Sequence, residues 1–181
     1  MKKFIFDLKR KIKRKIKQHT EKQEKKLPRI IVDSAVPLSD LLEASDLDRY
    51  DAYKFNESNF PQKFNNDKTE LLVRTFCFKN RKSSEEIIKF MNKVGFRPVT
   101  IYELLVIILR YPTFCKNSKY VFTALGSKFN NLDDESITVP SIMILEGMEK
   151  KVLSLRDWDS AWSGSSRIFI GVRRVRAKNK K

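Results

Sequence analysis

The residue types that carry out nucleophilic and metal chemistry are scarce in this chain of 181 residues. It holds one histidine, His19, and two cysteines, Cys77 and Cys115, which lie far apart in the sequence. A serine or cysteine nucleophile needs a histidine beside it as base, and zinc sites need several histidine or cysteine ligands at short spacing. The sequence therefore predicts no catalytic triad and no histidine metal site. We expect both cysteines to be buried, inert thiols.

Two acidic clusters could hold a metal or act as paired carboxylates. They occupy residues 133–135 (Asp-Asp-Glu) and 157–159 (Asp-Trp-Asp). Oxygen-rich clusters bind calcium, and two carboxyls in unequal surroundings can divide the acid and base roles. Neither cluster has EF-hand spacing, so we expect solvated turns. We predict no catalytic residue, no metal and no cofactor, and the sequence favours a protein that is not an enzyme without deciding the question.

An aromatic loop offers a candidate ligand contact. Trp158 and Trp162 precede the small residues Ser-Gly-Ser-Ser and then Arg167. Indole rings can stack on a base, a sugar or a peptide side chain. Large aromatic residues also build cores. Trp158, Trp162 and Arg167 are therefore ligand-loop candidates, with core packing as the alternative for the tryptophans.

The excess positive charge lies at the two ends of the chain. Residues 1–29 contain 13 basic and 3 acidic residues, and residues 173–181 contain 6 basic and no acidic residues. These ends supply the whole formal net charge of +16, so residues 30–172 are neutral. Basic tails can serve solubility alone, or they can bind a polyanion by releasing its counterions. The predicted polyanion-binding residues are Lys9, Arg10, Lys11, Lys13, Arg14, Lys17, Arg173, Arg174, Arg176 and Lys178.

The N-terminal segment has the pattern of a basic amphipathic helix. Apolar residues at positions 1, 4, 5, 8, 12 and 16 fall within an arc of about 120° on a helix, and lysine and arginine occupy most of the rest. Such a stripe needs cover from the domain, a partner helix or an anionic membrane surface. The longest apolar run, residues 104–109, is too short to span a bilayer.

Between the basic ends, the pattern predicts an α+β domain. Helices are expected at 37–44, capped near Ser39, at 84–94 behind a Ser83–Glu86 capping box, and at 101–110 behind a Thr100–Glu103 box. Strands are expected near residues 29–32, 71–78, 119–125, 137–145, 151–155 and 167–173. We predict one compact domain with a mainly antiparallel sheet and two short adjacent helices that pair locally. The divisions are residues 1–29, 30–172 and 173–181.

Several segments together resemble a known family. Residues 95–105 read Gly-Phe-Arg-Pro-Val-Thr-Ile-Tyr-Glu-Leu-Leu, followed by Tyr-Pro at 111–112, Ala-Leu-Gly-Ser at 124–127, Val-Pro at 139–140, Trp162, and Arg-Ile-Phe-Ile-Gly-Val-Arg at 167–173. This order resembles a family of small uncharacterised bacterial proteins with the pattern G-x-R-P-A-T-x-x-E-L-L, Y-P, A-L-G-S, V-P, W and R-F-x-A-V-R. The resemblance covers roughly residues 35–174 and implies no activity.

A more distant similarity is to C-type-lectin-like domains of the formylglycine-generating-enzyme type. Residues 95–103 and 170–173 are similar to segments of those domains in order and composition. The resemblance implies a loop-rich sheet whose final strand pairs back near the first. The paired active-site cysteines and calcium loops of that enzyme class have no counterparts in this sequence, so the resemblance implies no oxidase chemistry.

These observations favour a non-catalytic binding protein whose basic ends contact a polyanion. Nucleic acid is preferred over an anionic membrane surface bound through residues 1–17. The alternative is a C-type-lectin-like module that binds a protein or carbohydrate through its loops. The start of the chain is a poor secretory signal, so we expect a cytoplasmic location, with peripheral attachment to a membrane as the alternative.

Overall fold

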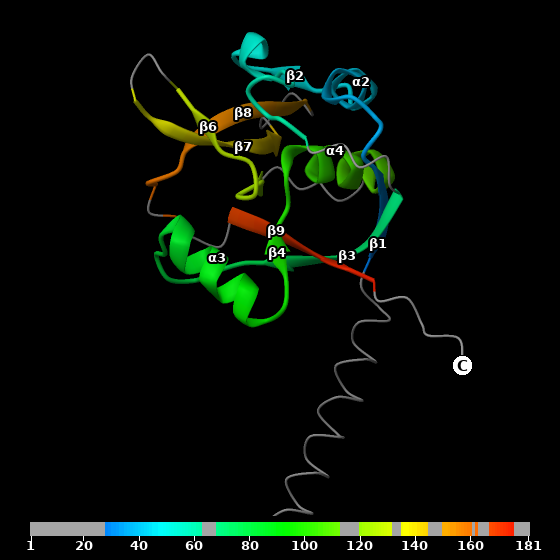
Figure 1. The fold of residues 1–181 in the computed structure, drawn as a ribbon. Helices are drawn as coiled ribbons and strands as arrows, with labels where there is room; N and C mark the ends of the chain where they lie inside the picture. Colours follow the sequence, from blue (N-terminus) through cyan, green and yellow to red (C-terminus); the bar gives the residue numbers. More distant parts are fainter. Residues whose placement is uncertain are drawn as a thin grey trace, which may run out of the picture.

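The computed structural model describes residues 28–62, 68–112, 120–131, 135–144, 150–160, 162 and 167–175. These residues form an α+β fold with one large, mostly antiparallel sheet, three α-helices and a short 3-10 helix (Figure 1). The predicted α+β class is confirmed at this level. The predicted N-terminal helix and most of the predicted C-terminal tail lie outside the described residues.

Nine strands build the sheet within this described part of the chain. Their order is β1-β3-β9-β5-β7-β8-β2, with β4 beside β9 and β6 beside β7. The bounds are β1 Arg29–Asp33, β2 Asp48–Arg49, β3 Lys68–Phe76, β4 Arg97–Pro98, β5 Val121–Thr123, β6 Phe129–Asn130, β7 Ile137–Ile144, β8 Lys151–Asp157 and β9 Arg167–Arg174. Each strand predicted from the sequence is present, with slightly different ends.

The last strand, β9, lies at the centre of the sheet. β3 pairs antiparallel along one edge of β9. Along the other edge, β5 pairs parallel with the first residues of β9, and β4 pairs antiparallel with Gly171 and Val172. Residues 168–172 are apolar or glycine, as expected for a strand that is covered on both faces.

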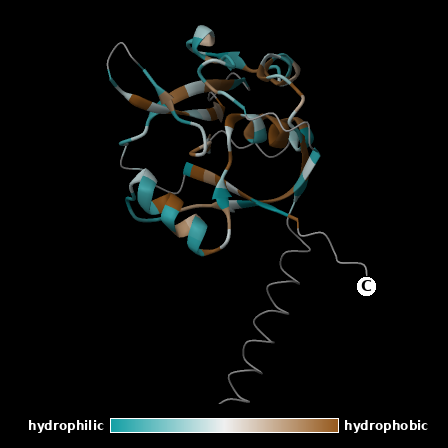
Figure 2. Cartoon of the chain, in the orientation of Figure 1, coloured by the Kyte–Doolittle hydropathy of each residue, from teal (hydrophilic) through white to brown (hydrophobic). Residues whose placement is uncertain are grey.

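Different helices cover the two faces of the sheet. α2 (Leu38–Ala44) and α4 (Ile101–Arg110) lie on one face, where Leu71 and Val73 of β3 join their core. α3 (Ser84–Lys93) lies on the other face, where Leu72 and Phe76 point. Alternate residues of a strand point to opposite faces, so the dense apolar run of β3 serves two cores. Figure 2 shows the hydrophobic colour concentrated on α4 and on the strands.

Both predicted capping boxes are present. The Ser83 hydroxyl accepts a hydrogen bond from the Glu86 backbone, and the Glu86 carboxylate accepts one from the Ser83 backbone. Thr100 and Glu103 make the same reciprocal pair at the start of α4. These bonds satisfy backbone N–H groups that a helix start leaves without partners. The two helix starts are thus fixed by local sequence.

The expected pairing of these two helices is wrong. α3 and α4 are adjacent in the sequence but lie on opposite faces of the sheet (Figure 1). β4 connects them by pairing with β9 and carries the chain past the sheet. α4 is buried almost all round and packs against β1 and α2 instead.

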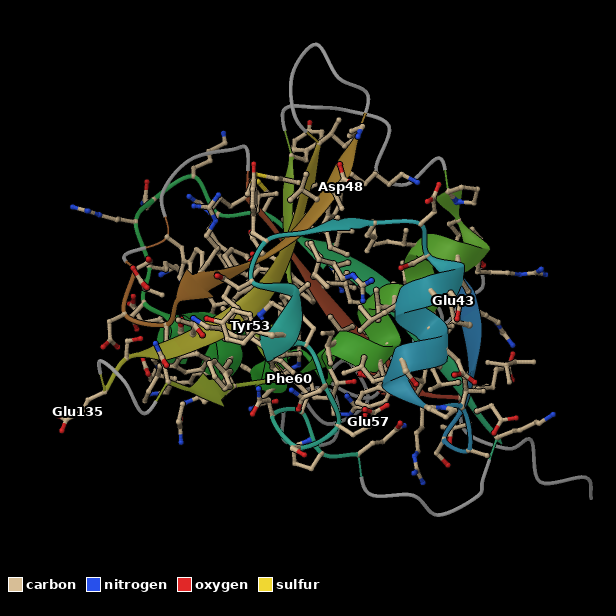
Figure 3. The ribbon with its side chains drawn as sticks, turned by 90° about the horizontal axis from the view of Figure 1, so that it is seen from above. Glu43, Asp48, Tyr53, Glu57, Phe60 and Glu135 are labelled. Carbon is tan, nitrogen blue, oxygen red and sulfur yellow. The ribbon has the colours of Figure 1, made fainter. Side chains whose placement is uncertain are left out.

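Residues 45–62 form a largely irregular layer that aromatic residues hold in place. Phe55 and Phe60 are buried and stack with ring centroids 5.9 Å apart. The Tyr102 hydroxyl on α4 donates to the Phe60 carbonyl oxygen at 3.0 Å. Ser39 does not cap α2 with its side chain; its backbone N–H donates to Glu57, which Figure 3 shows near that helix.

The turn at Gly126 is a tight backbone approach that admits no side chain. A Cβ atom there would lie 2.6 Å from the Val99 carbonyl oxygen, to which the Gly126 N–H donates. We predict that Gly126→Ala lowers the free energy of unfolding by about 2–4 kcal/mol, because backbone must move to relieve the clash. Urea unfolding measures this effect. The exposed Ser58→Ala should stay within about 0.5 kcal/mol of wild type, and an equally small effect at Gly126 would contradict the prediction.

Candidate functional site

The two basic ends leave the domain close together. Arg29, at the start of β1, and Arg173, near the end of β9, both lie opposite Leu72 of β3, which runs between them. Adjacent strands are about 4.8 Å apart, so the two exits are separated by roughly 10 Å. Figure 1 shows the start of β1 and the end of β9 side by side. The sheet thus places the first described residues and the last described residues of the chain next to each other.

A shallow arginine-lined groove lies at the end of β9. Its lining residues are Asn92, Gly95, Phe96, Arg97, Val172, Arg173 and Arg174, and its volume is about 290 Å³. We call this feature the arginine groove. The predicted site residues Arg173 and Arg174 both belong to it.

Guanidinium groups stack on a buried aromatic ring beside the groove. The Arg173 guanidinium lies 5.0 Å from the centre of the Phe96 ring, and that of Arg74 lies 5.8 Å from the same ring. Phe96 is only 4% exposed, so the surface over it consists mainly of guanidinium groups. Stacking holds these planar cations against the protein.

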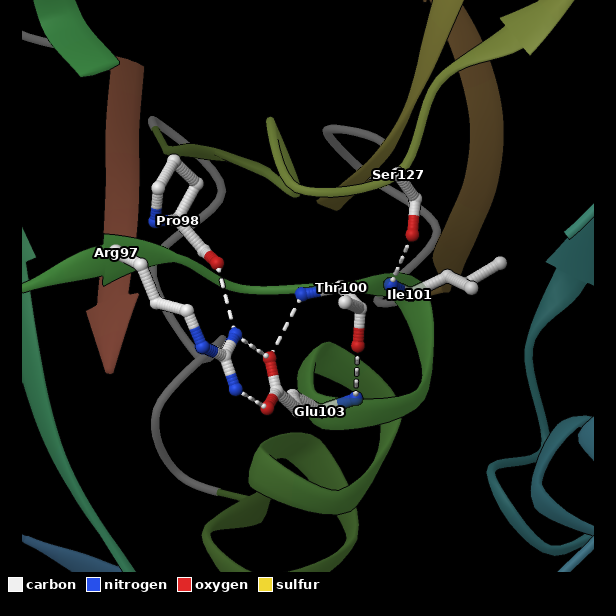
Figure 4. Close-up of polar contacts among 6 residues, drawn as sticks. All are labelled: Arg97, Pro98, Thr100, Ile101, Glu103 and Ser127. Atoms are coloured by element: carbon white, nitrogen blue, oxygen red, sulfur yellow. Dashed lines mark hydrogen bonds and ion pairs between the residues drawn. The ribbon is translucent and has the colours of Figure 1, made fainter. Parts of the chain in front are cut away.

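Arg97 is the anchored member of the groove (Figure 4). Its Nη1 and Nη2 donate to the two carboxylate oxygens of Glu103 at 2.8 and 2.5 Å, and Nη1 also donates to the Pro98 carbonyl. The hydrogen bonds to Glu103 raise the pKa of Arg97 above its usual value. Because this bidentate pair neutralises Arg97, the net charge of the groove comes from Arg173 and Arg174.

A larger cavity of about 460 Å³ lies on the α4 side of the sheet, between β1, β3 and residues 60–62. Arg97 and Arg174 line it as well as the arginine groove. The side-chain oxygen of Gln62 is buried there without a hydrogen-bond partner. Its size suits a small organic ligand, and its polar lining comes from hydroxyls, one amide, the Arg97–Glu103 pair and the cations Lys128 and Arg174. Arg174 therefore borders both the larger cavity and the arginine groove.

The predicted ligand-loop tryptophans are buried. Trp158 is 4% and Trp162 3% exposed, and their indole N–H groups donate to Glu85 and Ser84 of α3. The Lys128 ammonium lies 3.4 Å from the centre of the Trp158 ring. These contacts match the packing alternative, and Arg167 is the candidate of the three that stays partly exposed.

The remaining candidates fall outside the described residues or lie on the surface. Lys9, Arg10, Lys11, Lys13, Arg14, Lys17, Arg176 and Lys178 lie outside them. Cys77 is exposed, so the prediction of a buried thiol is wrong there, because β3 ends one residue before it.

Over the described ranges, no three His, Cys, Asp or Glu side chains are grouped so that they could hold a metal ion. No helix within those ranges has the length and apolar character to cross a bilayer.

Acidic residues gather in another part of the surface. Residues 37–60 contain six acidic and two basic residues. Figure 3 shows Glu43, Asp48 and Glu57 on the side seen from above, where α2 and β2 lie, and Figure 1 shows this side away from the ends of β1 and β9. Part of the negative charge of the domain thus lies away from the arginine groove, whereas Glu70 lies beside the chain ends and pairs with Arg29 at 3.1 Å.

Comparisons of the chain with models of protein families, with curated proteins and with solved structures find no match. The resemblances drawn from the sequence stay predictions. The function is therefore argued from the geometry of this chain.

The Arg97–Glu103 pair, which borders the groove, should contribute to the stability of the fold. Glu103 has a side chain only 7% exposed, whereas that of Arg97 is 50% exposed. We predict that Arg97→Met lowers the free energy of unfolding by about 2–3 kcal/mol, because it leaves a buried carboxylate without its cation. The double variant Arg97→Met/Glu103→Gln should recover about half of this loss, because glutamine can keep the capping bond without a charge. Denaturant unfolding of both variants tests the energetic coupling between Arg97 and Glu103. The coupling would be disproved if the effects of the two substitutions on the free energy of unfolding simply add.

The Glu85 carboxylate links α3 to the tryptophan cluster and should make stability depend on pH. Hydrogen bonds from its own backbone N–H and from the Trp158 indole lower the pKa of Glu85. A carboxyl with a lowered folded pKa adds stability above its unfolded pKa and loses it as the pH falls through the folded pKa. Between pH 5 and 3 the melting temperature of Glu85→Gln should therefore fall less steeply than that of wild type. Trp158→Phe, which removes the indole donor, should reduce the slope in the same direction.

Proposed function

We propose that the protein is a non-catalytic binding protein that attaches to a polyanion, preferably nucleic acid, through its two basic ends and the arginine groove between them. The observation that carries this proposal is the convergence of the two chain ends, with charges of +10 and +6, on one region of a domain that is otherwise neutral. A solubility role would not require that the charges be brought together.

The mechanism is phosphate contact with release of counterions. Arginine presents a planar fork of donors that matches phosphate oxygens, and each neutralised phosphate releases condensed cations. Phe96, the ring nearest the cations, lies beneath them and cannot stack on a base. We therefore expect binding that depends strongly on salt and weakly on sequence.

Nucleic acid is preferred because the cations of the groove are arginines, whose planar forks match phosphate oxygens. Binding to a membrane interface needs apolar groups that project past the cations into the acyl region. In the groove the aromatic ring is covered by guanidinium groups instead. The acidic surface of residues 37–60 would face away from a bound polyanion and orient the domain.

The C-type-lectin-like alternative predicts a protein or carbohydrate ligand at Trp158, Trp162 and Arg167. Both indole rings are buried and both indole N–H groups are already bonded. The geometry lends this alternative no support.

The salt dependence of binding tests the proposal. Fluorescence anisotropy with the full chain and a duplex of mixed sequence should give a log-log salt slope of about −0.9 for each phosphate contacted. Replacing Lys9, Arg10, Lys11, Lys13, Arg14 and Lys17 by glutamine should reduce the slope by up to about 5, and Arg173→Gln/Arg174→Gln by up to about 2. The matched control Lys54→Gln/Lys150→Gln removes two cations near the acidic surface and should leave the slope unchanged.

Two results would overturn the proposal. One is binding that does not change between 50 and 200 mM salt, and the other is an unchanged slope in both charge-neutralised variants. Binding to anionic vesicles that Ile12→Asp/Ile16→Asp abolishes, with nucleic-acid affinity absent throughout, would assign the ends to a membrane surface instead.

A further inference from the structure

Three buried polar atoms without hydrogen-bond partners lie on one face of the sheet. They are the Ser154 hydroxyl oxygen and Arg156 Nε on β8, and Arg167 Nη1 on β9. A fourth such atom belongs to Gln62, in the larger cavity described above. Buried polar groups are nearly always satisfied, so three orphan atoms in one area need a cause.

Strand register explains how these residues meet. On β8, Leu153 points to the α4 core. Because alternate residues of a strand point to opposite faces, Ser154 and Arg156 both point to the other face of the sheet. On β9, Ile168 contacts the α4 core, so Arg167 also points to the opposite face, where its guanidinium lies 5.2 Å from the centre of the Trp162 ring. Arg156 and Arg167 therefore lie on the same face of the sheet, with β5 and β7 between them.

Contacts within this cluster fix the position of Arg156. Its Nη2 lies 3.5 Å from the Met143 sulfur, and Met143 is paired with Val121, which in turn is paired with Arg167. The guanidinium of Arg156 thus extends along β7 toward the row that contains Arg167. It passes beside Ser141 and Ser154, which are themselves opposite each other.

A row of hydroxyls borders the two arginines. Thr123, Ser141 and Ser154 lie side by side on β5, β7 and β8. The Thr123 and Ser141 hydroxyls are 3.1 Å apart and bond to each other, whereas Ser154, 6% exposed, has no partner. One hydroxyl donor is therefore available beside two guanidinium groups.

The charges of Arg156 and Arg167 are not compensated within the described residues. Burial and the charge of Arg156 lower the pKa of Arg167. No ion pair joins either arginine to an acidic residue of the described ranges. Two partly buried cations that repel each other are unfavourable unless an anion lies between them.

We propose that Arg156, Arg167 and Ser154 form a binding site for a tetrahedral oxyanion, the phosphate group of a small molecule or of inorganic phosphate. Two guanidinium forks and one hydroxyl supply the charge-assisted donors that phosphate oxygens accept. The site is separate from the arginine groove, because Arg167 and Arg174 are at opposite ends of β9, about 23 Å apart along the strand.

Thermal unfolding of the full chain with inorganic phosphate tests this site. At constant ionic strength, with chloride as the replaced anion, wild type should show a saturable rise in melting temperature. At ten times the dissociation constant the rise should be roughly 3–6 °C. Arg156→Gln and Arg167→Gln should each abolish it. Without phosphate, Arg167→Gln should melt no lower than wild type, because the repulsion between the cations is gone.

Matched variants separate this site from other anion effects. Lys54→Gln removes a cation near the acidic surface of residues 37–60, outside both proposed sites, and should keep the full phosphate response. Arg167→Gln should keep the salt slope of nucleic-acid binding, so failure of one proposal is distinguishable from failure of the other. A nucleoside monophosphate that shifts the melting temperature at lower concentration than inorganic phosphate would identify a phosphomonoester as the ligand.

Several outcomes would overturn the proposal. A wild-type melting temperature that follows ionic strength alone, or a phosphate response that Arg156→Gln and Arg167→Gln both retain, would exclude the site. A rise in melting temperature that Arg167→Gln retains in full would likewise contradict it.

Discussion

The fold depends on a last strand, β9, that must be buried on both faces and paired along both edges. β3 occupies one edge, β5 and β4 share the other, and the two cores meet its alternate side chains. Such a strand has no room for a Cβ at Gly171, where one would lie 2.7 Å from the Phe76 ring. Among the described residues, the two halves of the sheet, β1–β3 and β5–β7–β8–β2, are joined only through β9, which is the last strand in the sequence.

This central strand also fixes where positive charge can lie. Arginine stands at both ends of β9, Arg167 at its start and Arg173 and Arg174 at its end, since charged heads are costly within the doubly covered middle. At the exposed end the cations are solvated and stack on Phe96. At the other end Arg167 is partly buried beside Arg156. The desolvation cost of an arginine is thus small at the exposed end of β9. At the other end, where Arg167 is partly buried, that cost is larger unless an anion lies nearby.

Local signals in the sequence predict the longer strands and the three α-helices, but they miss β2, β4 and β6 and do not give the arrangement of the elements. The capping boxes at Ser83 and Thr100 predicted both helix starts, because that chemistry involves residues three apart. The opposite placement of α3 and α4 depends on β4 pairing with β9, some 70 residues later, which no local pattern encodes. Likewise, the burial of Trp158 and Trp162 depends on acceptors on α3 that lie far away in the sequence. Of the candidate site, Arg173 and Arg174 were predictable from charge, whereas Arg97, Arg74 and Arg156 were not.

Charge count and charge placement have different consequences for binding. A net charge of +16 raises the affinity for any polyanion, and by itself it carries no selectivity. Selectivity needs donors held in fixed directions, and the sheet register holds Arg156 and Arg167 on one face of the sheet. Under the proposed function, the chain ends would supply attraction over a distance of a Debye length, about 8 Å at physiological salt, and the domain would determine which anion is retained.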